Sequence, residues 1–177
     1  MRKWSAQRGF TLIELMIAVF LSAIVLTFAV PSFRSIVQDN RLVTQINNLT
    51  TDLSLARSEA VKRGRRVTVC SGAVAANGDG CASPADWAGG WSAFVDVDGD
   101  GTLDTADGDL ALRSHVPLEG GLTLDYSGAN RITFDARGAT TNIGTFALCD
   151  DRGAGHARGR IISMTGRVRT ADPGGCS

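Results

Sequence analysis

The sequence predicts an α+β protein in which one long N-terminal helix packs on a small, antiparallel, β-rich C-terminal domain. Three observations predict this class. Residues 10–30 form an apolar run of membrane length, and apolar side chains at helical spacing continue to residue 60. Beyond residue 65 a period of two replaces the helical one, and strands that follow one another without intervening helices favour an antiparallel sheet.

The membrane half of the helix, residues 10–30, carries one charge, Glu14. Such a helix spans roughly 31 Å, which matches a bilayer core of about 30 Å. The basic residues Arg2, Lys3 and Arg8 precede the run and predict a cytoplasmic N-terminus. No secretory cleavage site of the Ala-x-Ala type follows the run, but a Gly9–Phe10 junction lies before it.

Glu14 requires a partner, because a carboxylate at membrane depth costs about 2.5–3.5 kcal/mol. Cleavage after Gly9 would create an amine on Phe10, four residues away in the same chain. The amine of a neighbouring subunit is a second candidate. The alternative is an ordinary anchor that tolerates one polar residue near its end.

The run Gly9-Phe10-Thr11-Leu12-Ile13-Glu14 after a basic leader resembles the class III signal of type IV pilins and type II secretion pseudopilins. The resemblance implies a pilin-like fold and a leader, residues 1–9, that a prepilin peptidase removes before methylating Phe10. It also implies that Glu14 guides assembly with other pilins or pseudopilins. The location implied is the bacterial inner membrane, crossed once with a periplasmic C-terminal domain, and then a pilus or pseudopilus.

The amphipathic half of the helix, residues 31–63, begins at Pro31, which can kink a helix without ending it. Gly64 is the expected C-terminal stop, after about Lys62. The predicted apolar stripe consists of Leu42, Val43, Ile46, Leu49, Leu53, Ala56 and Ala60.

The globular domain, residues 64–177, contains eight stretches with the pattern of strands, separated by turns rich in Gly and Asp. These are Arg66–Ser71, Trp91–Asp96, Ala111–Val116, Leu122–Tyr126, Arg131–Asp135, Thr145–Cys149, Arg160–Met164 and Val168–Thr170. The aromatic residues Trp87, Trp91, Phe94, Phe134 and Phe146 are expected in the core or at sheet edges.

Later motifs extend the resemblance over nearly the whole chain. Residues 56–63 followed by 67–70, the pair Gly90-Trp91, and the late run 166–169 are similar to minor pilins of the secretion-pseudopilin-H and FimT/FimU group. This implies a non-enzymatic subunit that primes or tips a type IV pilus. The alternative is the pseudopilin H of a type II secretion system.

Four cysteines, Cys70, Cys81, Cys149 and Cys176, lie on the expected non-cytoplasmic side, where disulfides can form. Three pairings are possible. We favour Cys70–Cys81 and Cys149–Cys176, because each would close a loop rich in Gly, Asp or Arg. A zinc site is the rival interpretation, although paired CxxC units are missing.

Residues 96–107 place aspartates at alternating positions around a glycine and resemble a twelve-residue calcium loop. The last ligand position holds Asp107 where a glutamate is usual. The alternative is an acidic hairpin turn, since Asp and Gly are ordinary turn residues. We assign no metal or cofactor from the sequence.

The C-terminal region is basic. Gly166-Arg167-Val168-Arg169 resembles the Gly-Arg-x-Arg element that, in the FimT branch, implies DNA capture for natural transformation, and Arg160 lies upstream of it. Arginine clusters bind phosphates, so double-stranded DNA is a candidate partner of Arg160, Arg167 and Arg169. Alternatively, these arginines pair with the acidic loop of the same or a neighbouring subunit.

Enzymatic activity is not expected. The two histidines, His115 and His156, are each expected to be structural or exposed, and no recognised catalytic or phosphate-binding motif is present. The precursor has no net charge, and removal of the leader would leave a formal charge of −3.

Overall fold

The computed structural model describes residues 9–72 and 79–176. The chain divides into two compact units, Met1–Asp39 and Asn40–Ser177. The expected leader therefore lies outside the described residues, apart from Gly9.

Helix α1 (Leu12–Arg63) starts after Thr11, whose hydroxyl accepts a hydrogen bond from the amide of Glu14. This is the pairing of a Thr N-cap with the third helical residue. Pro31 lies inside the helix without ending it, as expected. The apolar side chains between residues 10 and 30 are exposed, and α1 is long and apolar enough to cross a membrane.

The domain half of α1 ends as predicted. Gly64 has a positive φ of 62°, and the amide of Arg65 donates to the carbonyl of Ala60 at 3.2 Å, which closes the last turn. Six of the seven predicted stripe residues are buried, whereas Val43 is exposed. The structure adds Asp52 to the buried face.

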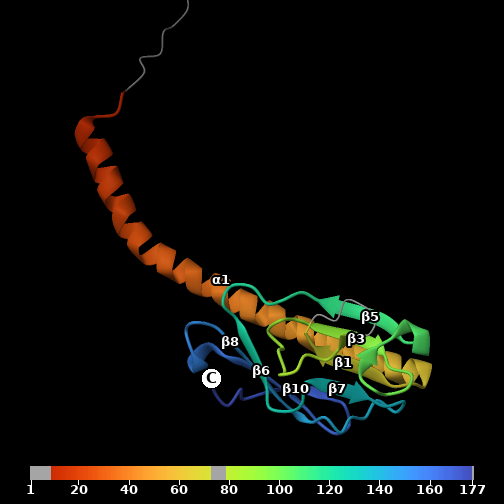
Figure 1. Cartoon of the computed structure of the whole chain (residues 1–177). Helices are drawn as coiled ribbons and strands as arrows, with labels where there is room; N and C mark the ends of the chain where they lie inside the picture. The colour runs from red at the N-terminus through yellow and green to blue at the C-terminus, as the bar shows by residue number, and fades with distance from the viewer. Residues whose placement is uncertain (1–8, 73–78, 177) are drawn as a thin grey trace, which may run out of the picture. The chain divides into compact units, whose positions relative to one another are not determined.

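The domain contains two four-stranded antiparallel sheets and one small ladder (Figure 1). The first sheet has the order β5-β3-β1-β7, and the second has the order β10-β9-β8-β6. The strands of the first sheet are β1 (Val67–Ser71), β3 (Trp91–Val95), β5 (Leu110–His115) and β7 (Arg131–Phe134). Those of the second are β6 (Thr123–Tyr126), β8 (Gly144–Cys149), β9 (Arg158–Ile162) and β10 (Val168–Ala171).

All eight predicted strands are present, with ends that differ by at most two residues. The two-residue strands β2 (Asp79–Gly80) and β4 (Thr102–Leu103) were not predicted, because so short a ladder has no visible period. Two 3₁₀ turns, η1 (Thr105–Asp107) and η2 (Ala154–His156), complete the described elements.

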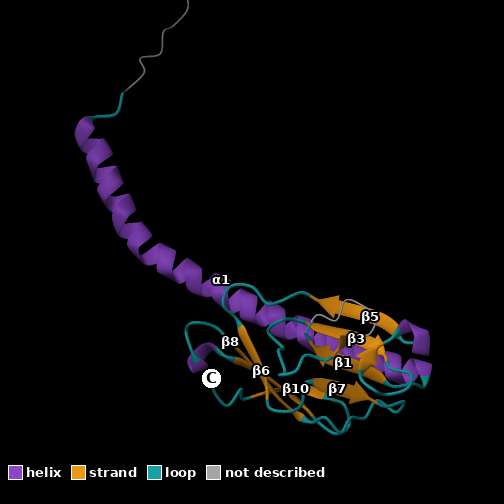
Figure 2. Cartoon of the chain, viewed as in Figure 1, coloured by secondary structure: helices purple, strands orange, loops and turns teal. Residues whose placement is uncertain are grey.

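The hydrophobic core combines side chains from the domain half of α1 and from the strands of both sheets. Figure 2 shows this half of the helix lying along the strands. Strand β1 is buried along its whole length, since β3 pairs with one edge and β7 with the other. All five aromatic residues assigned to the core or a sheet edge are buried: Trp87, Trp91, Phe94, Phe134 and Phe146. An α+β domain built on one long helix is therefore confirmed.

The cysteines form the two disulfides that the sequence favoured, Cys70–Cys81 and Cys149–Cys176, with Cα atoms 4.8 Å and 5.9 Å apart. The first packs with Phe94 and Leu103 in a second small core cluster, beside the β2–β4 ladder. The second joins β8 to the C-terminal segment. Since all four thiols are paired, the zinc alternative does not apply.

Candidate functional site

The head of α1 presents the proposed processing and assembly residues. Phe10 is exposed, and a Cβ added at Gly9 would meet no atom of the described residues within 4 Å. Glu14 lies in the first turn of the helix and is also exposed. Thr11 caps the helix between these residues, which fixes where the helix begins relative to the junction. The geometry leaves Glu14 available to a partner.

A groove on the domain lies between the end of α1 and the β9–β10 turn, and we call it the basic groove. Four of its nine lining residues are basic and none is acidic. It is lined by Ser54, Arg57, Ser58, Val61, Lys62, Arg137, Gly166, Arg167 and Val168. The ammonium of Lys62 lies 3.5 Å from a carboxylate oxygen of Glu59, which compensates part of its charge. The remaining positive charge suits an anionic ligand.

Two glycines, Gly138 and Gly166, bring two turns together beside the basic groove. Gly166 has a φ of 71°, and a Cβ there would collide with the carbonyl oxygen of Gly138. The guanidinium of Arg57 donates to that same carbonyl at 2.9 Å. Only glycine fits at position 166, because the two turns approach each other too closely for a side chain. The residue after it, Arg167, lines the basic groove.

Arg167 and Arg169 are both exposed and flank Val168, which is half-buried against the core. Arg167 comes directly after the tight turn in which the amide of Gly166 donates to the carbonyl of Ser163 at 2.8 Å. Arg169 lies on β10, an edge strand of its sheet. Neither guanidinium has an ion pair among the described residues.

Arg160 has a different environment. Its guanidinium donates to Thr50 at 3.2 Å and to Asn47 at 3.3 Å, both on α1. In the β9–β10 ladder Arg160 opposes Thr170, and Ile161 opposes Arg169, so Arg160 and Arg169 point to opposite faces of the sheet. The three arginines assigned to DNA from the sequence therefore do not form one surface, because Arg160 docks β9 on the helix.

Two further arginines of this region bond within their own loop. Arg152 forms an ion pair with Asp150 at 2.7 Å, and Arg158 donates to the carbonyl of His156 at 3.2 Å. Burial alone would raise the pKa of Asp150, but hydrogen bonds from Arg152 outweigh it and lower that pKa below its ordinary value. Both arginines stabilise the turn after β8, and Asp150 compensates the charge of Arg152.

Asp52 is a buried acid that sequence reasoning missed. The indole nitrogen of Trp91 donates to one of its oxygens at 2.9 Å, and the guanidinium of Arg113 lies 3.0 Å from the other. His115 stacks on Trp91 with ring centroids 4.0 Å apart. An aspartate beside Leu53 and Leu49 on the apolar stripe was the signal that could have revealed this network.

The acidic stretch does not adopt the twelve-residue calcium loop. Strand β4 lies inside it, and Asp104 caps η1 by accepting from the amide of Ala106 at 2.8 Å. Asp107 is exposed, and neighbouring Asp104 raises its pKa. Three carboxylates do lie close together here, but they are Asp96, Asp98 and Asp109, and the last of these was not predicted.

The family described as "Type II transport protein GspH" matches residues 45–166, which is more than half of the chain. The chain belongs to the GspH family. A second match, the "Prokaryotic N-terminal methylation motif", covers residues 4–30. That motif implies processing by a prepilin peptidase and assembly with pilins or pseudopilins, and it makes the apolar part of α1 consistent with a membrane anchor. A search of curated protein sequences found no significant match.

Solved structures of minor pilins and pseudopilins share the fold of this GspH-family protein. The type IV minor pilin FimU of Pseudomonas aeruginosa is 25% identical, with a TM-score of 0.59 over 77% of this chain and 92% of that chain. A second crystal form of FimU gives 23% identity and a TM-score of 0.56, over 75% and 94% of the two chains. The minor pseudopilin EpsH of Vibrio cholerae is 14% identical, with a TM-score of 0.50 over 76% and 98%.

Proposed function

We propose that this protein is a minor subunit of a type IV pilus. A prepilin peptidase would cut it after Gly9 and methylate Phe10, and Glu14 would then pair with an N-terminal amine during assembly. The inner membrane would hold α1 before assembly, with the domain in the periplasm. The likeness to the minor pilin FimU over 92% of that chain carries the proposal.

A second function, pseudopilin H of a type II secretion system, is favoured by the description of the family itself. A deletion strain separates the two. We expect loss of twitching motility with unchanged secretion of extracellular enzymes, restored by the intact gene in trans. Loss of secretion with normal twitching would replace the pilus proposal with the pseudopilin one.

The domain adds a binding function to this proposal, namely contact with the phosphates of double-stranded DNA. The basic groove and the exposed Arg167 and Arg169 support it, because arginine forks bind phosphate oxygens without reading sequence. The proposal no longer depends on Arg160, whose guanidinium is engaged with α1.

We expect the double substitution Arg167→Gln and Arg169→Gln to weaken binding to duplex DNA about tenfold at about 50 mM salt. Two lost phosphate contacts should also reduce the slope of log affinity against log salt by about two. Mobility-shift or anisotropy titration of the detergent-solubilised protein measures both quantities.

The matched control is Arg41→Gln with Arg65→Gln, which removes the same charge from two exposed arginines outside the basic groove. It should bind like the unmodified protein. An equal loss in both double variants would show that net charge alone attracts DNA, and equal binding by all three proteins would reject the phosphate contacts.

A further inference from the structure

The connection between β3 and β5 begins and ends with a carboxylate. Asp96 directly follows β3 and Asp109 directly precedes β5, and the ladder pairs Val95 with Leu110. The antiparallel pairing therefore brings these two aspartates together, although they are far apart in sequence. Asp98 completes the group, and one carboxylate oxygen from each residue lies within 4.8 Å of the others.

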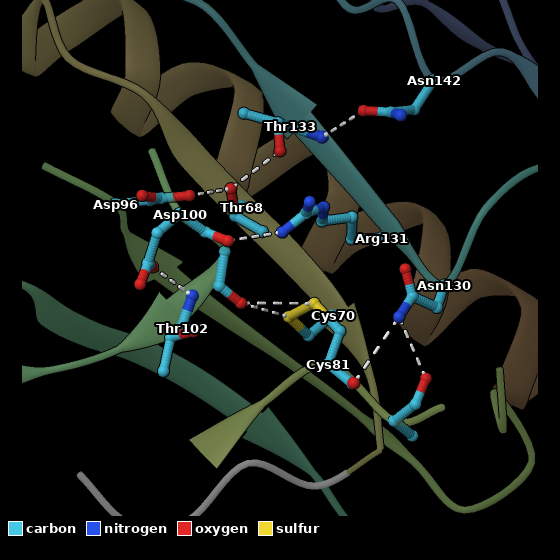
Figure 3. The surroundings of a disulfide bond; sticks show 12 residues. Thr68, Cys70, Cys81, Asp96, Asp100, Thr102, Asn130, Arg131, Thr133 and Asn142 are labelled. Atoms are coloured by element: carbon cyan, nitrogen blue, oxygen red, sulfur yellow. Dashed lines mark hydrogen bonds between the residues drawn. A yellow bond between two sulfur atoms is a disulfide. The ribbon is translucent and has the colours of Figure 1, made fainter. Parts of the chain in front are cut away.

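Asp96 is 1% exposed, so its carboxylate is removed from water. The hydroxyl of Thr68 donates to its Oδ2 at 2.7 Å, and Thr133 in turn contacts Thr68 at 2.8 Å (Figure 3). The other oxygen, Oδ1, is buried and has no hydrogen-bond partner in the part of the chain that the structure describes. A buried carboxylate oxygen without a partner is unfavourable, so its presence points to a ligand.

Asp98 and Asp109 are held in place by backbone amides. Asp109 accepts from the amide of Val97 at 2.8 Å and from that of Asp104 at 3.1 Å. Asp98 accepts from the amide of Asp100 at 3.3 Å and is otherwise exposed. Since each carboxylate oxygen has a further lone pair, these bonds orient the groups and leave them able to bind a cation.

Two arginines fix the backbone around the cluster without neutralising it. The guanidinium of Arg66 donates to the carbonyl of Asp98, and that of Arg131 donates to the carbonyl of Asp100, each at 2.7 Å (Figure 3 shows the second). Gly99 and Gly101 have positive φ, and a Cβ at either would collide with these guanidinia. Among described residues, the three carboxylates have no ion-pair partner.

We propose that Asp96, Asp98 and Asp109 bind a divalent cation, and that this cation is calcium. The ligands are all carboxylate oxygens, which suit hard cations rather than zinc or copper. Calcium takes oxygen ligands at about 2.3–2.6 Å in a flexible geometry, whereas magnesium demands a near-ideal octahedron at about 2.0–2.1 Å. The three oxygens lie within 4.8 Å of one another, a spacing that the larger and more flexible calcium shell accommodates more readily, and Asp98 leaves one side of the cluster exposed.

Calcium at this position would tie the start of the connection to its end and so stabilise β5, an edge strand of its sheet. Three protein ligands, one of them exposed, and two nearby guanidinia indicate weak affinity, with a dissociation constant of about 0.1–1 mM. That range is typical of extracellular modules.

The test uses calorimetric titration and thermal melting of the full-length, detergent-solubilised protein after chelator treatment. We expect saturable heat and a rise in melting temperature of about 3–6 °C at about 5 mM calcium, with a smaller rise for magnesium. Asp98→Asn should weaken binding at least tenfold, because asparagine keeps the bond to the Asp100 amide but loses the charge.

Asp107→Asn is the matched control, since it removes one charge from the same loop but from outside the cluster. It should bind calcium within about threefold of the unmodified protein. An equal loss of calcium affinity in the two variants would mean that the general negative charge of the loop attracts calcium, and would overturn the proposed site. A protein that shows neither heat nor a melting shift at the same calcium concentration would overturn it as well.

Discussion

Replacement of Asp52 by alanine is expected to lower the melting temperature of the domain by about 6–12 °C, which corresponds to about 2–3 kcal/mol in the free energy of unfolding. The change leaves the indole nitrogen of Trp91 buried without an acceptor, and it removes the anchor that joins α1 to β3 and β5. Most of the cost comes from Trp91. Arg113 is 56% exposed and can return to water.

Two further variants separate these contributions. Asp52→Asn keeps an oxygen for Trp91 and loses only the charge, so it should cost about 1 kcal/mol. Arg113→Met removes the ion pair alone and should cost less than about 1 kcal/mol, because half-exposed pairs are screened by solvent. If Arg113→Met proves as damaging as Asp52→Ala, the ion pair dominates and our account of Trp91 is wrong. Thermal melts of the three variants decide this.

Asp52 also illustrates what the sequence could not reveal. The helix, its glycine stop and the eight long strands follow from local periods and turn residues, which act over a few positions. The partners of Asp52 lie on β3 and β5, 39 and 61 positions away. The helical pattern shows that an acid lies within an apolar stripe. It cannot show which residues the acid bonds to, because the order of the strands in the sheet brings those residues close.

The basic region around β10 and the acidic stretch between β3 and β5 also show which residues the sequence could identify and which needed the sheet pairing. The Gly-Arg-x-Arg run identified Arg167 and Arg169, and both are exposed. The sequence grouped Arg160 with them because all three are basic, whereas the β9–β10 register turns Arg160 toward α1. In the acidic stretch, the resemblance to a twelve-residue calcium loop favoured Asp107 as the last ligand. Antiparallel pairing of β3 with β5 brings in Asp109 instead.

Replacement of Glu14 by valine is expected to remove the protein from filaments while leaving it processed and in the membrane. In the apolar environment of helix α1, valine is more favourable than a carboxylate, so insertion should not suffer. Assembly should suffer, because packing of apolar helices gains no hydrophobic free energy inside lipid and the proposed charge pair would supply the direction. We expect the ratio of protein in sheared filaments to protein in the membrane fraction to fall at least about tenfold. This corresponds to about 1.4 kcal/mol or more in the free energy of assembly.

The matched control is Ser22→Val, a second polar-to-apolar change in the same part of α1. The hydroxyl of Ser22 donates to the carbonyl of Ala18 at 2.7 Å, so its proton is engaged within its own helix and it carries no charge that a neighbour could pair with. This variant should enter filaments normally. Glu14→Gln should fail like Glu14→Val, since it keeps a hydrogen-bonding group but cannot pair with an ammonium. Normal incorporation of Glu14→Gln would show that hydrogen bonding rather than charge directs assembly, and normal incorporation of Glu14→Val would remove Glu14 from the mechanism.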